Sequence, residues 1–172
     1  AVNAFRRNAL NPDHPCIRGT AQNDDIYFQT RETVNKYYEV IPDLVEEAMA
    51  DLAKVTGREH HVFDYYGAPD AERVVIAMGS LNQTLVEAVD YLNGKGEKVG
   101  MVAVHLFRPF SVKHFLNAIP ETVTKIAVMD RTKEPGALGE PLYQDVRTAF
   151  YNTDRHPVIV GGRYGLGGKD VN

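Results

Sequence analysis

The chain has almost no cysteine, since Cys16 is the only one among its 172 residues. One thiol cannot close an internal disulfide, and it cannot hold an iron–sulfur cluster, which several cysteine thiolates ligate. No apolar run approaches the ~20 residues that a membrane-spanning helix needs. These shortages argue against a disulfide scaffold, an iron–sulfur module and a membrane protein. They favour a domain of the reducing cytoplasm.

The chain also lacks a surplus of positive charge. Its formal net charge is -4, and its isoelectric point is about 5.9. A nucleic-acid-binding protein or a protein of anionic membrane surfaces ordinarily carries a basic footprint, so neither class is expected. With 44% apolar and 24% charged residues, the composition is typical of a globular domain with one core.

The two ends of the sequence predict a piece of a longer polypeptide. The chain begins Ala-Val-Asn, without an initiator Met or a signal-peptide pattern, and its last residues follow a glycine-rich turn directly. The first part of residues 1–40 is rich in turn-forming residues. We therefore expect residues 1–40 to form an irregular or helical arm that belongs to the end of a preceding domain. Residues 41–172 predict the main domain.

The main domain opens with a predicted helix between Pro42 and Gly57. Leu44, Ala48 and Leu52 recur at helical spacing, whereas Glu46 is expected to face away from the apolar side. A short preceding helix is expected over 31–38. Gly57 suits the left-handed residue that ends a helix.

Strand and helix patterns alternate from about residue 63 onward. Apolar strands are expected at 74–78, 99–107, 125–130 and 158–160, with helices between them. Such alternation predicts right-handed crossovers and a mainly parallel sheet. The expected fold class is therefore α/β, a three-layer αβα sandwich of four or five strands.

Two segments carry the candidate functional residues. The loop after the third predicted strand holds Arg131, Lys133 and Glu134 at the carboxyl edge of the sheet, where α/β folds often bind ligands or partners. The glycine-rich stretch 161–169 holds Arg163 and Lys169 and could contact an anion. A tight turn that leads into the next domain is the favoured explanation, since no helix pattern follows and the dinucleotide-binding fingerprint is not matched.

Other features predict structural roles. Ser80 stands three residues before Gln83, the spacing of a helix-capping box. The six histidines show no metal-ligand spacing, so no metal site is predicted. Arg18 lies in a turn-rich segment and is an anion-contact or domain-junction candidate only beside a partner domain.

Long stretches of the chain resemble pyruvate:ferredoxin (flavodoxin) oxidoreductases. The resemblance covers nearly the whole chain. The matching stretches are FRRNALNPDHP (5–15), RGTAQN (18–23), DIYFQ (25–29), FDYYGAPDAERV (63–74), DRTKEPGALGEPLY (130–143) and GGRYGL (161–166). Three positions depart from the family pattern: Asp24 replaces a usual proline, His105 a usual arginine and Gly168 a usual serine. The last two weaken an anion contact at those positions.

The resemblance implies a transketolase C-terminal-like domain within a larger, homodimeric enzyme. Such an enzyme converts pyruvate and coenzyme A to acetyl-CoA and carbon dioxide. It uses thiamine diphosphate, magnesium and 4Fe-4S clusters, held in other domains, and reduces ferredoxin or flavodoxin. The resemblance therefore assigns no catalytic residue, cofactor or metal to this chain.

Three functions remain open from the sequence. The first is a non-catalytic assembly domain that contacts other domains of the same polypeptide. The second is a Rossmann-like module that binds a nucleotide or coenzyme A, and the third is a protein–protein module without a small ligand. The candidate interface or anion contacts, taken over all three functions, are Arg18, Arg131, Lys133, Glu134, Arg163 and Lys169.

Overall fold

The structure, a computed structural model, describes residues 1–16, 19 and 21–167. Contacts divide the chain into two compact units, Ala1–Tyr37 and Tyr38–Asn172. The first contains helices α1 (Val2–Arg6) and α2 (Asp24–Glu32), and neither helix has a buried residue. Its apolar side chains stay open, with Phe5 79% exposed and Phe28 70% exposed. This unit has no core of its own among its described residues.

Helix α3 (Asn35–Thr56) differs from the two separate helices expected over this region. It is one continuous helix with Pro42 inside it. A proline removes one helical hydrogen bond, which makes a helix boundary there the natural expectation. The 22-residue helix continues on both sides of this defect. Its end is as expected, because Gly57 has a φ of +71° and its N–H donates to the carbonyl of Ala53.

The second unit contains a five-stranded sheet of order β1-β3-β2-β4-β5. The strands are β1 (Phe63–Gly67), β2 (Arg73–Ala77), β3 (Val99–Val104), β4 (Lys125–Asp130) and β5 (Val158–Arg163). Strands β2 to β5 are parallel, whereas β1 runs antiparallel to β3 at one edge. The predicted α/β class with a mainly parallel sheet is thus confirmed. Strand β1 was not predicted as a separate element.

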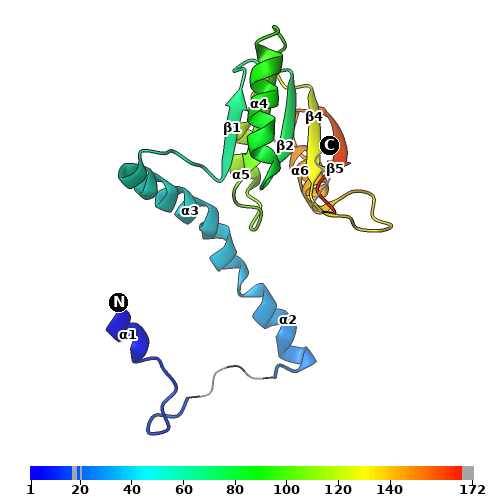
Figure 1. The fold of residues 1–172 in the computed structure, drawn as a ribbon. Helices are drawn as coiled ribbons and strands as arrows, with labels where there is room; N and C mark the ends of the chain where they lie inside the picture. The colour runs from blue at the N-terminus through cyan, green and yellow to red at the C-terminus, as the bar shows by residue number, and fades with distance from the viewer. Residues whose placement is uncertain (17–18, 20, 168–172) are drawn as a thin grey trace. The chain divides into compact units, whose positions relative to one another are not determined.

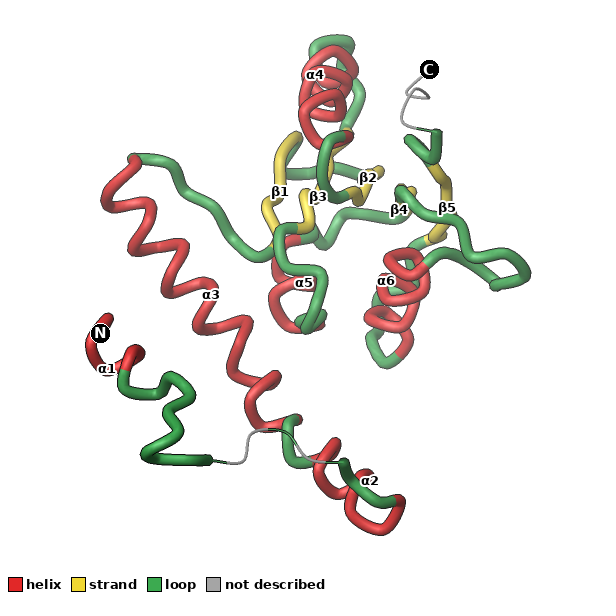
Figure 2. The backbone as a smooth tube through the Cα atoms, turned by 60° about the horizontal axis from the view of Figure 1, so that its bottom comes forward, coloured by secondary structure: helices red, strands yellow, loops and turns green. Residues whose placement is uncertain are grey.

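Helices cover both faces of this sheet (Figures 1 and 2). Helix α4 (Leu81–Asn93) lies on one face, and α5 (Val112–Ala118) and α6 (Pro141–Tyr151) lie on the other (Figure 2). The larger core lies on the α5–α6 face, where Phe115, Ile76 and Val146 are fully buried. Strand β3 is buried along its whole length, as expected of a central parallel strand.

Two helix starts follow the sequence pattern and one does not. Ser111 accepts a hydrogen bond from the His114 N–H at the start of α5, and Pro141 occupies the first turn of α6. Ser80 stands at the N-cap position of α4, but its side chain makes no capping bond. The prediction of a Ser80 cap is therefore wrong in its chemistry, because this hydroxyl bonds elsewhere.

In the part of the chain that the structure describes, no helix is both long and apolar enough to cross a membrane.

Candidate functional site at the carboxyl edge of the sheet

The last residue of β4, Asp130, fastens the start of α6. Its two carboxylate oxygens accept the backbone N–H groups of Leu142, at 3.0 Å, and Tyr143, at 3.1 Å. The first N–H groups of a helix have no partner within the helix, so this carboxylate caps α6 from a neighbouring strand. Asp130 is only 1% exposed. Burial raises its pKa above the usual range, although the two N–H groups oppose that shift.

A second carboxylate closes the loop between β4 and α6. Glu140, immediately before Pro141, accepts the Glu134 N–H at 2.7 Å and Arg163 Nε at 2.5 Å. The bond from Arg163 holds the pKa of Glu140 below its usual range, and the charge of Lys133 acts in the same direction. Since Arg163 ends β5, this ion pair ties the loop to the neighbouring strand.

Arg131 links the ends of three parallel strands. Its Nε donates to the Gly165 carbonyl, at 3.1 Å, and its Nη1 donates to Ser80 Oγ, at 3.2 Å. Ser80 follows β2 and Gly165 follows β5, while Arg131 itself follows β4. This contact uses the Ser80 hydroxyl that was expected to cap α4. We call Asp130, Arg131, Glu140 and Arg163 the β4–β5 cluster.

The predicted site residues divide into three groups. The structure places Arg131 and Arg163 in this cluster, and the backbone N–H of Glu134 bonds to its Glu140. Lys133 is exposed in the same loop. Arg18 and Lys169 lie outside the described residues. Whether any of them contacts a partner or an anion stays a prediction.

Sequence reasoning missed Asp130 and Glu140, the two buried carboxylates of the cluster. Both had a recognisable signal. Asp130 ends an apolar strand and Glu140 precedes a proline that begins a helix, so each is well placed to satisfy N–H groups of the following segment. The cluster contains one ion pair, between Glu140 and Arg163, and its other charged groups bond to backbone groups and to Ser80, so this geometry holds a loop in place.

The glycine stretch is a strand at its start, which opposes its use as a phosphate loop. Gly161 and Gly162 belong to β5 and pair with Val128 and Met129 of β4. A phosphate loop instead presents successive backbone N–H groups to an anion. Gly165, with a φ of +63°, makes the turn that follows.

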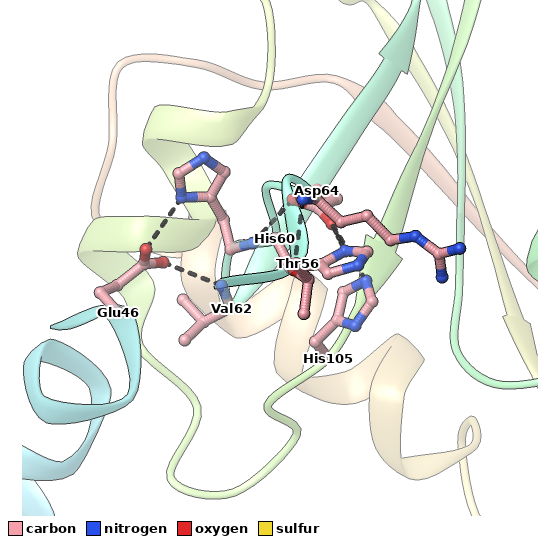
Figure 3. A network of polar contacts seen from close by, with 8 residues as sticks. Glu46, Thr56, His60, Val62, Asp64 and His105 are labelled. Carbon is pink, nitrogen blue, oxygen red and sulfur yellow. Dashed lines mark hydrogen bonds and ion pairs between the residues drawn. The ribbon is translucent and has the colours of Figure 1, made fainter. Parts of the chain in front are cut away.

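A further cluster lies at the same edge of the sheet, beside β1 and β3. His60 Nδ1 and His105 Nε2 each lie 3.2 Å from the same oxygen, Oδ2, of Asp64. Figure 3 shows the two imidazole rings turned toward this carboxylate, and their centroids are 5.5 Å apart. We call these three residues the β1–β3 cluster. No sequence pattern predicts this cluster, because His105 is 41 residues from Asp64 and strand pairing brings the two together.

The contacts of Glu46 show that the predicted orientation of helix α3 is wrong. It was expected to face away from the apolar side of the helix, the side expected to pack, but its Oε1 accepts the Val62 N–H at 2.8 Å and its Oε2 lies 2.9 Å from His61 Nδ1 (Figure 3). Burial raises the pKa of Glu46, but these hydrogen bonds outweigh it and leave the pKa below its usual value. The predicted apolar stripe stays open instead, with Leu44 54% and Leu52 52% exposed.

Comparisons with known proteins identify the family. Residues 71–172 match the family model described as pyruvate:ferredoxin oxidoreductase core domain II. The chain is 65% identical over 171 residues to a pyruvate-flavodoxin oxidoreductase of Enterobacter agglomerans, covering 99% of this chain and 15% of that protein. It is 58% identical over 172 residues to the pyruvate:ferredoxin oxidoreductase of Moorella thermoacetica, covering 100% of this chain and 15% of that protein.

A solved structure is also similar: a 2-oxoglutarate:ferredoxin oxidoreductase from Magnetococcus marinus with 2-oxoglutarate, coenzyme A and succinyl-CoA bound. The TM-score is 0.42 at 20% identity, over 66% of this chain and 18% of that one. The chain spans about 15% of the length of the curated relatives named above. The family match over 71–172 and the similarity along the whole chain agree with the resemblance first seen in its motifs. The chain belongs to the pyruvate:ferredoxin oxidoreductase family.

Proposed function

We propose that this chain is a non-catalytic assembly domain of an enzyme that oxidises pyruvate. The complete polypeptide would convert pyruvate and coenzyme A to acetyl-CoA and carbon dioxide, and reduce ferredoxin or flavodoxin. The names of the related proteins support the substrate and the electron acceptors. Iron–sulfur clusters do not fit this chain, since it has only Cys16 as a thiolate ligand. Thiamine diphosphate and the clusters would then lie in other domains.

The observation that carries this proposal is an apolar sheet face left open beside α4. Strands of parallel sheets are normally covered on both faces. On the α4 side, however, Val158 and Val160 of β5 are 63% and 56% exposed. They line a hollow of about 280 Å³ together with Val75, Leu92 and Ala127. Its lining is almost entirely apolar, and such a surface favours contact with another protein segment.

The open stripe of α3 supports the same role. Glu46 holds this helix to the domain by one side, while Leu44 and Leu52 remain more than half exposed on the helix surface. The β4–β5 cluster fits an assembly domain as well, because its hydrogen bonds and its ion pair fix a long loop without depending on a ligand. Other domains of the same polypeptide are the proposed partners of these apolar surfaces.

Val160→Asp tests the proposal when it is measured in two contexts. In the 172-residue chain, the new carboxylate stays in water, so the unfolding midpoint in urea should change little. In the complete polypeptide, the carboxylate would be buried against an apolar partner, which costs several kcal/mol unless it is paired. We expect a clear fall in the thermal unfolding temperature of the complete polypeptide, together with faster limited proteolysis.

Tyr91→Asp is the matched control, since Tyr91 lies on α4 and is 63% exposed, close to the 56% of Val160. An equally small effect of Val160→Asp in both contexts would refute the assembly role of this face. The alternative functions are separated by titrating the 172-residue chain. Stoichiometric binding of ADP or coenzyme A in a calorimetric titration would favour a nucleotide-binding module. Magnesium-dependent binding of thiamine diphosphate would contradict the proposal.

A further inference from the structure

The β1–β3 cluster has the donor atoms of a small metal site. Two imidazole nitrogens and one carboxylate oxygen, from His60, Asp64 and His105, all lie within 4.8 Å of one another. Imidazole and carboxylate are common ligands of zinc and of the other late first-row divalent metals. We propose that these three residues bind such a divalent cation, with water completing its coordination.

The distances within the cluster support a shared ion. With metal–ligand bonds of about 2.1 Å, neighbouring ligand atoms of a tetrahedral or octahedral site lie about 3.0–3.4 Å apart. Both imidazole nitrogens lie 3.2 Å from Asp64 Oδ2. The third edge, between the two nitrogens, is at most 4.8 Å and closes when the rings turn. The side chains of His60 and His105 are 46% and 34% exposed, so this adjustment is sterically open.

Backbone contacts hold the three ligands in register. Asp64 Oδ1 accepts the His61 N–H at 2.9 Å, which leaves Oδ2 directed toward the imidazoles. The His105 N–H donates to the Val62 carbonyl at 3.0 Å, and Phe63 pairs with Val104 in the sheet. A ligating carboxylate whose second oxygen is fixed by another hydrogen bond is the usual arrangement around protein metals.

The β1–β3 cluster is partly exposed, so water can reach an ion that these residues hold. Three protein ligands leave at least one coordination position for water, as in zinc sites with two histidines and one carboxylate. The ion would join the end of β3 to the loop that leads from α3 into β1. In the absence of an ion, the same contacts are hydrogen bonds, and each imidazole nitrogen must then carry a proton. The protons on these ring nitrogens therefore distinguish the ion-free chain from the chain with a bound ion.

Titration of the 172-residue chain with zinc chloride tests the proposal. The experiment uses a Cys16→Ser background, because the Cys16 thiol is an alternative zinc ligand. Calorimetry should show one zinc per chain. His60→Gln, Asp64→Asn and His105→Gln should each weaken binding by at least ~100-fold, since loss of an outer hydrogen bond alone costs 10–100-fold. His156→Gln, remote in sequence and exposed, is the control and should bind as the parent chain does.

Long-range ¹H–¹⁵N spectra of the histidine rings provide a second measurement that needs no variant. Zinc should shift the ring nitrogens of His60 and His105 and leave those of His14 and His156 in place. No stoichiometric binding, or binding that all three ligand variants retain, would overturn the proposal. Zinc-induced shifts at other histidines only would overturn it as well.

Discussion

Two polar clusters lie at the same edge of one sheet and differ in access to water. In the β4–β5 cluster, Asp130 and Glu140 are 1% and 5% exposed, and backbone N–H groups or an arginine satisfy their oxygens. In the β1–β3 cluster, Asp64 faces two partly exposed imidazoles. The carboxyl edge of the sheet therefore supports two uses. A closed cluster stabilises the loops, and an open one keeps donor atoms available to an ion.

The strongest test of this contrast compares Asp130→Ala with Asp64→Ala. Asp130→Ala leaves two N–H groups of α6 without their acceptor, one of them buried, and should lower the free energy of unfolding by about 2–4 kcal/mol. Asp64→Ala removes the acceptor of the exposed His61 N–H and of the two partly exposed imidazoles of His60 and His105, and water can replace it at each of them. It should cost about 1 kcal/mol or less without added metal.

Urea unfolding of the 172-residue chain, with a metal chelator present, measures both values. Asp130→Asn refines the comparison, since an asparagine can still accept one of the two N–H bonds. It should fall between the native chain and Asp130→Ala. Equal costs for the two alanine variants would mean that burial does not distinguish the clusters.

The pH dependence of stability probes the ion pair of the β4–β5 cluster. Arg163 lowers the pKa of Glu140 in the folded chain, so the pair stabilises the fold above the unfolded-state pKa of about 4.3. That stability is lost as the pH falls through the lower, folded pKa. Glu140→Gln should therefore destabilise the chain at pH 7 and differ progressively less from the native chain as the pH falls below 4.

Asp130 contributes with the opposite sign in the same cluster. Burial raises its pKa in the folded chain, so the fold gains from its protonation and loses this gain as the pH rises. Subtracting the Glu140→Gln curve from the native curve removes the part of this background that comes from burial, whereas the part that comes from the charge of Glu140 stays in the difference. Glu121→Gln, at an exposed turn, is the control. A native-minus-variant difference that stays constant between pH 7 and 3.5 would contradict the ion-pair assignment.

The sequence predicted what depends on local patterns and missed what depends on pairing between distant segments. Alternating strand and helix patterns predicted the parallel sheet, and Gly57 and Ser111 ended and began helices as their residue types favour. The orientation of Glu46 and the meeting of His105 with Asp64 depend on long-range contacts that helical or strand periodicity does not encode. Asp130 and Glu140 are a different case, because their positions at the end of a strand and before a proline are local signals that the sequence analysis did not use.

Ser80 shows the same limit at a single hydroxyl, and it supplies the smallest expected effect. The capping-box spacing is present, yet Ser80 has helical backbone angles, φ -65° and ψ -22°, and its Oγ accepts from Arg131. Ser80→Ala should thus lose only an exposed hydrogen bond and cost about 0.5 kcal/mol or less. Ser111 has extended backbone angles and caps α5, so Ser111→Ala should cost about 1 kcal/mol. Urea unfolding of the two variants in parallel measures both costs. It separates Ser80, which only matches the capping spacing, from Ser111, which makes the capping hydrogen bond. If Ser80→Ala proves the costlier of the two, its hydroxyl contributes more to the ends of β2 and β4 than an exposed bond can explain.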